Sequence, residues 1–451
     1  MARDMTQGSP LKQLILFSGP MLVGGIFQQL YNMVDTMVVG RFVGEKALAA
    51  VGATGSLNFL IVSLLIGLSS GLSIIFGQYF GAKDYAGIRR AFANAIYLTV
   101  GITVLVSAAG IIFARPLLQL LNTPEDILDL AWLYLVINLA GTIGIAVYNG
   151  AVGILRAFGD SFMPLIFLIV ASTLNALLDL VFVLGFGMGV DGAAYATILS
   201  QALSAVITVI YMMRKMRFLR MPLKELRPSK DMTLLSLRLT IPAALQNGTV
   251  AAGGMFLQRF INEYGSTVVA AYSAAQRVDQ IAIQFTMTLG AAFGTYTSQN
   301  VGAGNYDRVN KGLKQALFLN VAISAFVTAL ILVFGKAFLG LFCKPGETEV
   351  IRIGYEYLQI VSPFFIFVGG VFIFRNMFQG AGDVLFPFVM SAAELVARIV
   401  IAAMLTGTLG YIGVFWGTPA AWILGSGIGV IYFFRGTWRT KSIVKDAPQE
   451  G

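Results

Sequence analysis

The amino-acid sequence predicts an all-α polytopic membrane protein, with twelve transmembrane helices in two pseudo-symmetric six-helix lobes. Three observations support this prediction. Of the 451 residues, 57% are hydrophobic and only 12% are charged, whereas soluble domains carry about 25% charged residues. The apolar runs reach about 20 residues, as a membrane-crossing helix requires, and do not alternate over about 10 residues as in a barrel. The two halves of the chain also repeat each other.

Twelve candidate spans follow from windowed hydropathy. They cover residues 13–37, 53–79, 92–114, 128–154, 162–186, 191–213, 233–261, 267–297, 314–340, 353–379, 386–408 and 411–434. Met1 to Pro10 is polar and the first apolar run has the length of a full span. We therefore expect no cleavable signal peptide.

The basic residues predict the orientation of these spans. They gather after the second span, between the sixth and seventh, after the eighth and in the C-terminal tail, at Lys83, Arg89, Arg90, Arg214, Lys215, Arg217, Arg220, Lys224, Arg227, Lys230, Arg308, Lys311, Lys314, Arg435, Arg439, Lys441 and Lys445. With twelve spans, all four regions fall on one side, and an excess of Lys and Arg marks the cytoplasmic side. We expect a multi-pass protein of the cell inner (plasma) membrane with both termini cytoplasmic. The net charge of +9 then reflects topology and not a nucleic-acid partner.

The basic link divides the chain into an N-lobe (1–213), a linker (214–232), a C-lobe (233–435) and a tail (436–451). FGQYFGAKDYAGIRRAFANA (76–95) is echoed by YTSQNVGAGNYDRVNKGLKQ (296–315), and RAFGDSFMPL (156–165) by QGAGDVLFPF (379–388). Six-span halves keep the same membrane orientation, so the repeat predicts a substrate path at the interface between halves. We expect tight turns at the repeated Gly81, Gly302, Gly159 and Gly382, and Pro164 and Pro387 in the first turn of the next helix.

Two aspartates lie alone inside apolar runs of the first half, Asp35 in LVGGIFQQLYNMVDTMVVG and Asp179 in LIFLIVASTLNALLDLVFVLGF. A charged carboxylate at bilayer depth costs about 2.5–3.5 kcal/mol on insertion scales, so intramembrane acids are candidate proton or cation sites. Asn175 lies four residues before Asp179, and hence on the same helix face. Further polar residues that belong to this predicted pocket are Gln28, Tyr31, Thr197 and Gln201.

Such an oxygen-rich pocket permits two kinds of chemistry. Protonated acids are neutral and tolerated in low dielectric, and burial with mutual repulsion favours protonation. Deprotonated acids offer hard oxygen ligands for a small cation such as Na⁺. A third interpretation is purely structural: each acid is then a hydrogen-bonded packing residue, and Asp35 is the more open to it because it lies near the exoplasmic end of its span.

The second half does not copy these acids, since the repeat aligns Asp35 near Leu257 and Asp179 near Ala402. Its polar residues are candidates for the substrate route: Gln246, Arg277, Asp279, Asn376 and Glu394. Arg375 and Arg398 add positive charge. Glu394 and Arg398 are spaced i, i+4, which predicts that they neutralise each other on one helix face. The alternative for these charged residues is a structural salt-bridge network.

Four segments together resemble the multidrug and toxic compound extrusion (MATE) transporters: QQLYNMVDTMVVGRFVGEKALAAVG, QYFGAKD, LRAFGDSFMP and LNALLDLVFVLGFGMGVDGAAYAT. The resemblance covers nearly the whole chain and indicates a bacterial member. It implies an antiporter that exchanges an inward H⁺ or Na⁺ for an outgoing organic, often cationic, compound. It also implies an N-lobe cation site at Asp35, Asn175, Asp179 and Thr197. Some relatives carry an acid in the seventh span, which this chain lacks.

Two other functions compete with this reading. A flippase of lipid-linked oligosaccharides, from the same superfamily, would need a strongly cationic cavity. A membrane-embedded enzyme would need a nucleophile–base pair or a metal cluster, and a chain with no His and one Cys leaves only aspartyl chemistry between Asp35 and Asp179. We therefore expect no enzyme, no cofactor beyond the coupling ion, no nucleic-acid partner, and a monomer in the lipid bilayer that binds small organic substrates.

Overall fold

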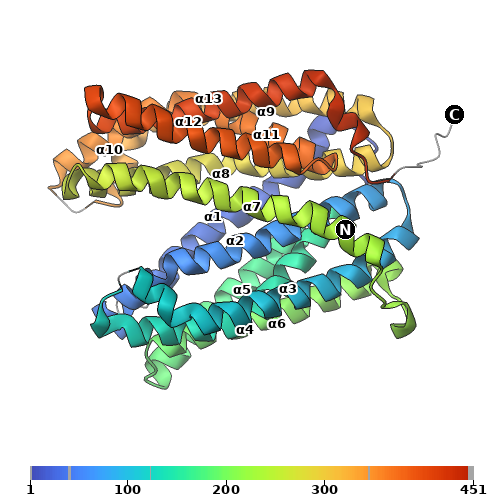
Figure 1. Ribbon diagram of the computed structural model, residues 1–451, viewed down its shortest axis with the longest axis horizontal. Helices are drawn as coiled ribbons and strands as arrows, with labels where there is room; N and C mark the ends of the chain where they lie inside the picture. The colour runs from blue at the N-terminus through green and yellow to red at the C-terminus, as the bar shows by residue number, and fades with distance from the viewer. Residues whose placement is uncertain (1–2, 39–41, 122, 344–345, 445–451) are drawn as a thin grey trace. The chain divides into compact units, whose positions relative to one another are not determined.

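The computed structural model describes residues 3–38, 42–121, 123–343 and 346–444, with side chains except those of residues 32–38, 45, 56, 223 and 251. The regular elements of these residues are helices (Figure 1). The first half contains α1 (Pro10–Val38), α2 (Glu45–Gly81), α3 (Tyr85–Leu120), α4 (Glu125–Ala157), α5 (Phe162–Leu180), the π-helical η2 (Val181–Gly185), α6 (Val190–Lys215), η3 (Arg217–Leu219) and η4 (Leu223–Glu225). The second half contains α7 (Lys230–Asn262), α8 (Ser266–Gly302), α9 (Tyr306–Gly340), α10 (Thr348–Val361), η5 (Ser362–Phe364), α11 (Phe365–Gly380), α12 (Leu385–Leu409), α13 (Tyr411–Arg435) and η6 (Thr437–Thr440).

The helices agree with the predicted all-α architecture, and most of them extend beyond the predicted apolar spans. The third span, predicted at 92–114, lies within α3 (Tyr85–Leu120). The tenth is interrupted at η5, where Pro363 separates α10 from α11, because proline has no amide hydrogen for the helix. Hydropathy alone therefore located the helices well but underestimated their length.

Ten segments of the described chain are long and apolar enough to cross a membrane. These are Pro10–Tyr31, Leu57–Gly81, Tyr85–Leu120, Glu125–Ala157, Phe162–Gly185, Val190–Lys215, Tyr306–Gly340, Thr348–Gly380, Leu385–Leu409 and Tyr411–Arg435. The predicted seventh and eighth spans correspond to α7 and α8, which are 33 and 37 residues long but more polar than these ten. The count of twelve spans stays a prediction.

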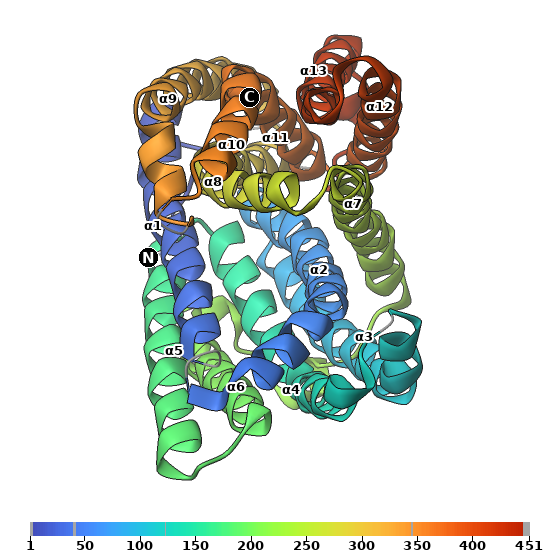
Figure 2. The same ribbon diagram turned by 90° about the vertical axis from the view of Figure 1, so that its left-hand side faces the viewer.

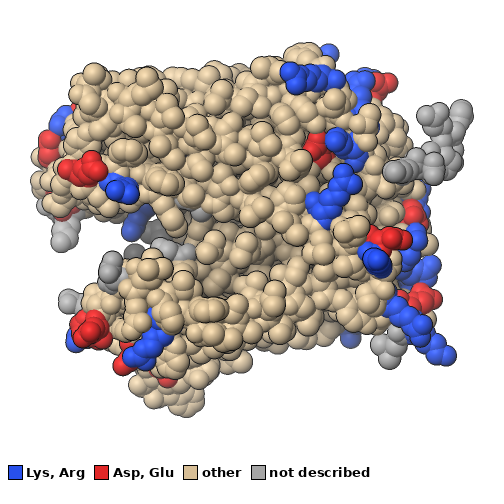
Figure 3. Space-filling view, viewed as in Figure 1, with Lys and Arg blue, Asp and Glu red and all other residues tan. Residues whose placement is uncertain are grey.

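The outer surface suits hydrocarbon. Leu105 and Ile112 on α3 are 71% and 70% exposed, and Val333 on α9 is 71% exposed. In Figure 3, uncharged side chains cover the middle of the visible helices, while Lys, Arg, Asp and Glu gather toward helix ends. A large apolar area of this kind marks a membrane-facing surface.

The chain forms two compact units whose boundaries lie inside α1 and α7. Unit 1 comprises Met1–Arg3 and Val23–Ala244, and unit 2 comprises Asp4–Leu22 and Leu245–Gly451. The first part of α1 thus belongs to unit 2, and the first part of α7 belongs to unit 1. Each boundary falls two residues after a proline inside the helix, Pro20 or Pro242. The predicted lobes, in contrast, assign each of these helices to one lobe.

Unit 1 is built on α4, which packs along α2, α3 and α6, while α5 packs along α6. Close backbone approach fixes the α2–α7 contact in this unit. A Cβ on Gly67 would meet the backbone of Ala244 at 2.4 Å, and one on Gly71 would meet Thr240. Small residues at such contacts allow membrane helices to pack closely. In unit 2, α8 packs along α9, α10 and α11, and α12 packs along α13 (Figure 2).

Unit 2 holds the segment that precedes α1 by hydrogen bonds, and unit 1 holds the segment that precedes α7. In unit 2, the Met5 amide donates to Gln299 Oε1 at 2.8 Å, the Met5 side chain is fully buried, and Arg308 Nη2 donates to the Gly8 carbonyl at 3.0 Å. In unit 1, the Ser229 amide donates to Asn94 Oδ1 at 3.2 Å. These contacts explain why residues 4–22 and 230–244 are exchanged between the units.

The repeated turns fold much as predicted, with one correction. Gly159 and Gly382 have φ of 79° and 96°, a left-handed conformation that favours glycine. Pro164 and Pro387 lie in the first turns of α5 and α12, as predicted. Gly81 and Gly302, however, are the last residues of α2 and α8. The left-handed residues there are Lys83 (φ 56°) and Gly304 (φ 73°), two residues later, because the chain completes the helical hydrogen bonds before it turns.

Candidate functional site

The candidate cation site of unit 1 is centred on α5. Asn175 and Asp179 lie one helical turn apart and are each only 1% exposed. The π-helical segment η2 begins two residues after Asp179. Single π-helical turns inside α-helices are frequent at functional sites. The predicted pairing of Asn175 and Asp179 on one buried face is therefore confirmed.

Three helices contribute side chains to one chain of hydrogen bonds at Asn175. The Tyr31 hydroxyl of α1 donates to Asn175 Oδ1, and Asn175 Nδ2 donates to Thr197 Oγ1 of α6 at 3.5 Å. The Thr197 hydroxyl donates in turn to the Ala193 carbonyl at 3.0 Å. All donors point the same way, so the proton positions on Tyr31 and Thr197 are fixed by their partners.

This arrangement joins two of the predicted site residues, Asn175 and Thr197, to the predicted Tyr31, and Asp179 lies one turn further along α5. Asp35 lies on α1, one helical turn after Tyr31, and its side chain is outside the described residues. Among the side chains that are described, no three acidic, His or Cys groups gather as metal ligands would. The oxygens that the described residues offer are one carboxylate, one amide and two hydroxyls.

The remaining candidates of unit 1 lie nearby in sequence. Gln28 is half-buried on α1, three residues before Tyr31. Gln201 is half-buried on α6, one turn after Thr197, and its Oε1 has no hydrogen-bond partner among the described residues. An amide oxygen without a partner in a buried position is an acceptor available to a ligand.

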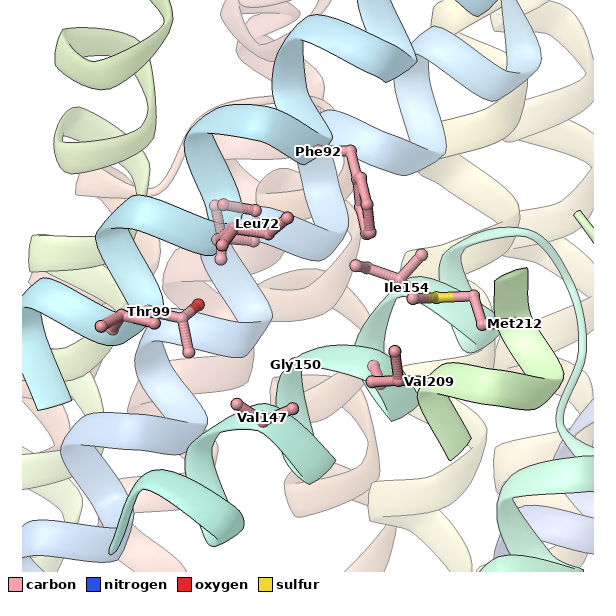
Figure 4. A pocket seen from close by; sticks show the side chains of 12 residues that line it. Leu72, Phe92, Thr99, Val147, Gly150, Ile154, Val209 and Met212 are labelled. Atoms are coloured by element: carbon pink, nitrogen blue, oxygen red, sulfur yellow. The ribbon is translucent and has the colours of Figure 1, made fainter. Parts of the chain in front are cut away.

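Unit 1 also contains two apolar cavities that do not include these polar residues. One, of about 200 Å³, lies among α2, α3, α4 and α6, where Phe92, Ile154 and Met212 point toward one another (Figure 4). The other, of about 520 Å³, lies between α4 and α6, beside Gly141 and Gly144. Their walls are hydrocarbon, with Thr99 contributing a hydroxyl to the first. They can accept apolar groups but bring no charge to them.

In unit 2, Asp279 of α8 is 3% exposed and accepts a hydrogen bond from the Tyr357 hydroxyl of α10 at 3.3 Å. Gln276 Nε2 donates to the same hydroxyl at 3.1 Å. Arg277 is exposed and lies over the Phe342 ring, 5.7 Å from its centroid. Arg277 and Asp279 therefore face different ways, because residues two apart on a helix do not share a face.

The expected pairing of Glu394 with Arg398 is wrong. Glu394 Oε1 instead accepts from Arg375 Nη2 of α11 at 2.7 Å, and this is the one buried ion pair among the described side chains. Gly425 of α13 packs directly on Glu394, where a Cβ would approach Oε1 to 2.6 Å. Sequence spacing missed this pair because Arg375 comes from a different helix. Its burial and tight packing favour the structural alternative for Glu394.

The last two candidate residues of unit 2, Gln246 and Asn376, also form hydrogen bonds within the protein. Gln246 of α7 is 5% exposed and accepts from Gln379 Nε2 at 2.8 Å. Asn376 of α11 donates to the Phe372 carbonyl at 2.8 Å. At the positions that the repeat aligns with Asp35 and Asp179, unit 2 buries Leu257 and Ala402, which are 2% and 0% exposed.

Sequence reasoning missed a matched pair of helix caps. Asp160 Oδ1 accepts the Met163 amide at 3.1 Å, and the Tyr211 hydroxyl donates to Asp160 Oδ2 at 3.4 Å. In unit 2, Asp383 Oδ1 accepts the Phe386 amide at 3.2 Å, and the Tyr432 hydroxyl donates to Asp383 Oδ2. The signal was present, because Tyr211 and Tyr432 are separated by the same 221 residues as the repeated Gln78 and Gln299. Such caps satisfy the free amides at a helix start.

The repeat also continues past the last helix of each half. Phe218 of η3 packs on Tyr85 with ring centroids 5.3 Å apart, and Trp438 of η6 packs on Tyr306 with centroids 6.0 Å apart. Phe218 follows the C-terminal end of α6 and Trp438 follows that of α13, the helix of the sixth predicted span in each half. The duplication thus includes the turns that close each unit.

Comparison with known proteins agrees with this duplication. The model of the MatE family matches residues 20–181 and again residues 242–404, which together make up well over half of the chain. The two matches start 222 residues apart and confirm the predicted internal repeat.

Among curated proteins, the chain is 31% identical to the probable multidrug resistance protein YpnP of Bacillus subtilis (strain 168), over 98% of this chain and 99% of that protein. It is 24% identical to the multidrug export protein MepA of Staphylococcus aureus (strain MRSA252), over 90% of this chain and 89% of that one.

Among solved structures, a MATE protein crystallised in complex with MaL6 superposes with a TM-score of 0.91 at 25% identity, covering 97% of this chain and 99% of that one. An outward-facing multidrug resistance transporter of the MATE family, within the MOP superfamily, superposes with a TM-score of 0.90 at 25% identity, covering 98% and 99%.

Proposed function

This chain belongs to the MatE family of multi-pass membrane transporters, and from that premise we propose that it is a multidrug efflux antiporter. It exports organic, often cationic, compounds in exchange for an inward H⁺ or Na⁺. The exchange proceeds by alternating access and uses one cation site in the first half of the chain. As a family member it is a secondary transporter and not an enzyme.

The observation that carries this proposal is the buried Asp179 beside the Tyr31–Asn175–Thr197 hydrogen-bond chain. A carboxylate at 1% exposure is strongly destabilised unless a proton or cation neutralises it. Cation binding therefore changes the charge of a buried site, and any conformation that alters the burial of Asp179 is linked to cation occupancy.

The hydrogen-bond chain supports a proton more than Na⁺ as the coupling ion. Asn175 Oδ1 already accepts from Tyr31, and Thr197 Oγ1 already accepts from Asn175. Each of these oxygens keeps a second lone pair, but Na⁺ needs several oxygens directed at it at the same time. A proton needs only the Asp179 carboxylate itself.

The contacts of the arginines in unit 2 do not favour the alternative function, a lipid-linked oligosaccharide flippase. The Arg375 charge is neutralised by Glu394, and Arg277 lies on an aromatic ring at the surface. Arg398 is the third arginine, and a single guanidinium near the buried Asp279 does not make a strongly cationic cavity. These contacts leave no concentrated positive charge for a pyrophosphate group among the described residues of that unit.

We further propose the orientation, location and assembly that the sequence predicts. Both termini are cytoplasmic, the protein lies in the plasma membrane, and it works as a monomer in the bilayer. The support is the distribution of basic residues, which includes Arg220 after η3, Arg308 in the first turn of α9 and Arg439 in η6. Accessibility of single cysteines in place of Ser229 and Ser442, probed from either side of intact cells, would test the orientation.

The deciding experiment is transport in proteoliposomes under a pH gradient alone and under a Na⁺ gradient alone. We expect wild-type protein to move a fluorescent organic cation against its gradient when ΔpH is imposed, and Asp179→Asn to fall to the level of empty liposomes. Asp129→Asn is the matched control, since Asp129 forms a surface pair with Arg115 and its side chain is 78% exposed. Full transport by folded Asp179→Asn would overturn the proposed site, and a wild type driven only by Na⁺ would replace H⁺ with Na⁺.

A further inference from the structure

Unit 2 contains its own buried carboxylate, Asp279, in the middle of α8. Only 3% of the residue is exposed. Oδ2 accepts one long hydrogen bond, 3.3 Å, from Tyr357 of α10, whose ring is fully buried. Tyr357 in turn accepts from Gln276. The carboxylate is thus held on one side only, by the hydroxyl of a neutral residue.

The other oxygen of the carboxylate is the unusual feature. Asp279 Oδ1 is buried and has no hydrogen-bond partner among the described residues. An ionised carboxylate can accept about four hydrogen bonds, so the charged form is poorly satisfied in this environment. Burial of a charge without partners is far more costly than burial of a neutral carboxyl group. The surroundings fit the neutral, protonated acid.

The charged and titratable groups around Asp279 come from three helices. Tyr272 lies on α8 itself and Tyr357 on α10, and their rings pack edge to face with centroids 5.4 Å apart. Arg398 on α12 is within electrostatic reach of Asp279 and both tyrosines. On α9 and α11, which also pack on α8, Lys336 lies over the Tyr355 ring and Arg375 is paired with Glu394.

Arg398 also has a buried nitrogen, Nε, that lacks a hydrogen-bond partner among the described residues. Among the same residues, no ion pair within 4 Å joins Arg398 to Asp279. Asp279 and Arg398 are near each other but not in contact, and each has a buried atom without a hydrogen-bond partner among the described residues. A small movement that brings them into contact would give both a partner. Such an ion pair would stabilise the charged form of Asp279.

We propose that Asp279 is a second proton-binding carboxylate of the transport cycle, located in unit 2. In the present conformation Oδ1 carries the proton. In the alternate conformation the O–H bond breaks, the proton passes to a water molecule that reaches the site, and the Arg398 guanidinium balances the charge of the carboxylate. This inference rests on the proposed H⁺ exchange and assigns it a second site.

The number of coupled protons gives a transport test. With the membrane potential clamped to zero, each coupled proton multiplies the equilibrium substrate accumulation by about tenfold for one unit of ΔpH. We expect about a hundredfold accumulation per pH unit for wild type, about tenfold for Asp279→Asn and none for Asp179→Asn. Asp307→Asn, which removes an exposed carboxylate on α9 of the same unit, should match wild type.

Infrared spectroscopy of the purified protein gives a test that does not depend on transport. The difference spectrum between wild type and Asp279→Asn at neutral pH should contain the C=O stretch of a protonated carboxyl group, which Asp307→Asn should not remove. Absence of that band from the difference spectrum would overturn the proposal, whatever the accumulation ratio. A wild type indifferent to ΔpH would refute the proposed H⁺ exchange, while the band would still decide whether Asp279 holds a proton.

Two further variants keep the proposal open to refutation if Asp279→Asn does not fold. Tyr357→Phe removes the hydrogen bond to Oδ2, and Arg398→Gln removes the positive charge that would balance the carboxylate. Both changes destabilise the charged form, so the C=O band should persist to higher pH than in wild type. A band that titrates at the wild-type pH in both variants would show that these groups do not control Asp279, and would overturn the proposal.

Discussion

The two units share their turns and differ in their buried charges. Asp160 and Asp383 cap α5 and α12 in the same way and accept from Tyr211 and Tyr432. Yet unit 1 buries Asp179 where unit 2 buries Ala402, and unit 2 buries an Arg375–Glu394 pair. The duplicated chain therefore kept the elements that end one helix and begin the next, while its buried polar residues diverged.

Physical cost explains this division. A cap satisfies backbone amides that every helix start leaves free, so both copies need it whatever the protein transports. Burying an acid in a membrane costs free energy, and the acid does not stabilise the fold unless it is paired. When one copy keeps a buried acid at a position where the other has an apolar residue, as at Asp179 and Ala402, that position has a role that its counterpart lacks. Substitutions at corresponding features of the two units can test this comparison.

The largest effect is expected at the buried ion pair of unit 2. Glu394→Ala leaves Arg375 buried without its partner, and breaking a buried pair in this way costs about 3–5 kcal/mol. The thermal unfolding midpoint in detergent should fall strongly. The double variant Arg375→Met/Glu394→Met removes both charges and should recover most of the loss.

The same variants decide whether Glu394 is structural. If the double variant folds and transports like wild type, the Arg375–Glu394 pair serves packing and has no role in transport. Loss of transport by a stable double variant would instead place Glu394 on the substrate route, and the comparison between the units would no longer hold.

A smaller effect is expected in the hydrogen-bond chain of unit 1. Tyr31→Phe removes the donor to the buried Asn175 Oδ1, and an unsatisfied buried acceptor costs about 1–3 kcal/mol. We expect a modest fall in thermal stability together with a changed pH dependence of transport, because the site beside Asp179 loses its fixed orientation. Tyr357→Phe is the corresponding variant in unit 2, since it removes the tyrosine hydroxyl beside Asp279. If Tyr31→Phe leaves the pH profile of transport unchanged, the Tyr31–Asn175–Thr197 hydrogen bonds are not part of the coupling site.

The helix caps should respond alike in the two units. Asp160→Ala and Asp383→Ala each remove an N-terminal cap, a change that typically costs about 1 kcal/mol. Thermal unfolding should show two similar decreases, and transport by the folded fraction should persist in both. A much larger loss of transport for one of them would mean that its turn has acquired a role in the cycle that the other lacks.

The smallest effect is expected at the left-handed turn residues, Lys83 in unit 1 and Gly304 in unit 2. A non-glycine residue in this conformation is disfavoured by about 1–2 kcal/mol. Lys83→Gly should therefore stabilise the protein slightly or leave it unchanged, because glycine also gains freedom in the unfolded chain. Gly304→Lys should destabilise it by about 1 kcal/mol. Equal melting curves for the two variants would contradict the φ angles.

Most of the fold could be predicted from the sequence because its signals are local. Apolar runs located the helices, and the glycine and proline positions located turns such as Gly159 and the start of α5. The helix lengths were underestimated, as at α3, because a helix continues past the membrane boundary wherever its backbone hydrogen bonds can. The exchange of residues 4–22 and 230–244 had no local signal, since it depends on contacts such as Met5 with Gln299, 294 residues apart.

The candidate site divides in the same way. The sequence by itself determined that Asn175 and Asp179 share a buried face, because a four-residue spacing on an apolar helix leaves no alternative. Only the tertiary structure decided which groups meet across helices: Tyr31 with Asn175, Tyr357 with Asp279, and Arg375 rather than Arg398 with Glu394. The physical reason is that helical periodicity fixes the neighbours within a helix, whereas neighbours between helices depend on how close small residues such as Gly425 allow them to pack.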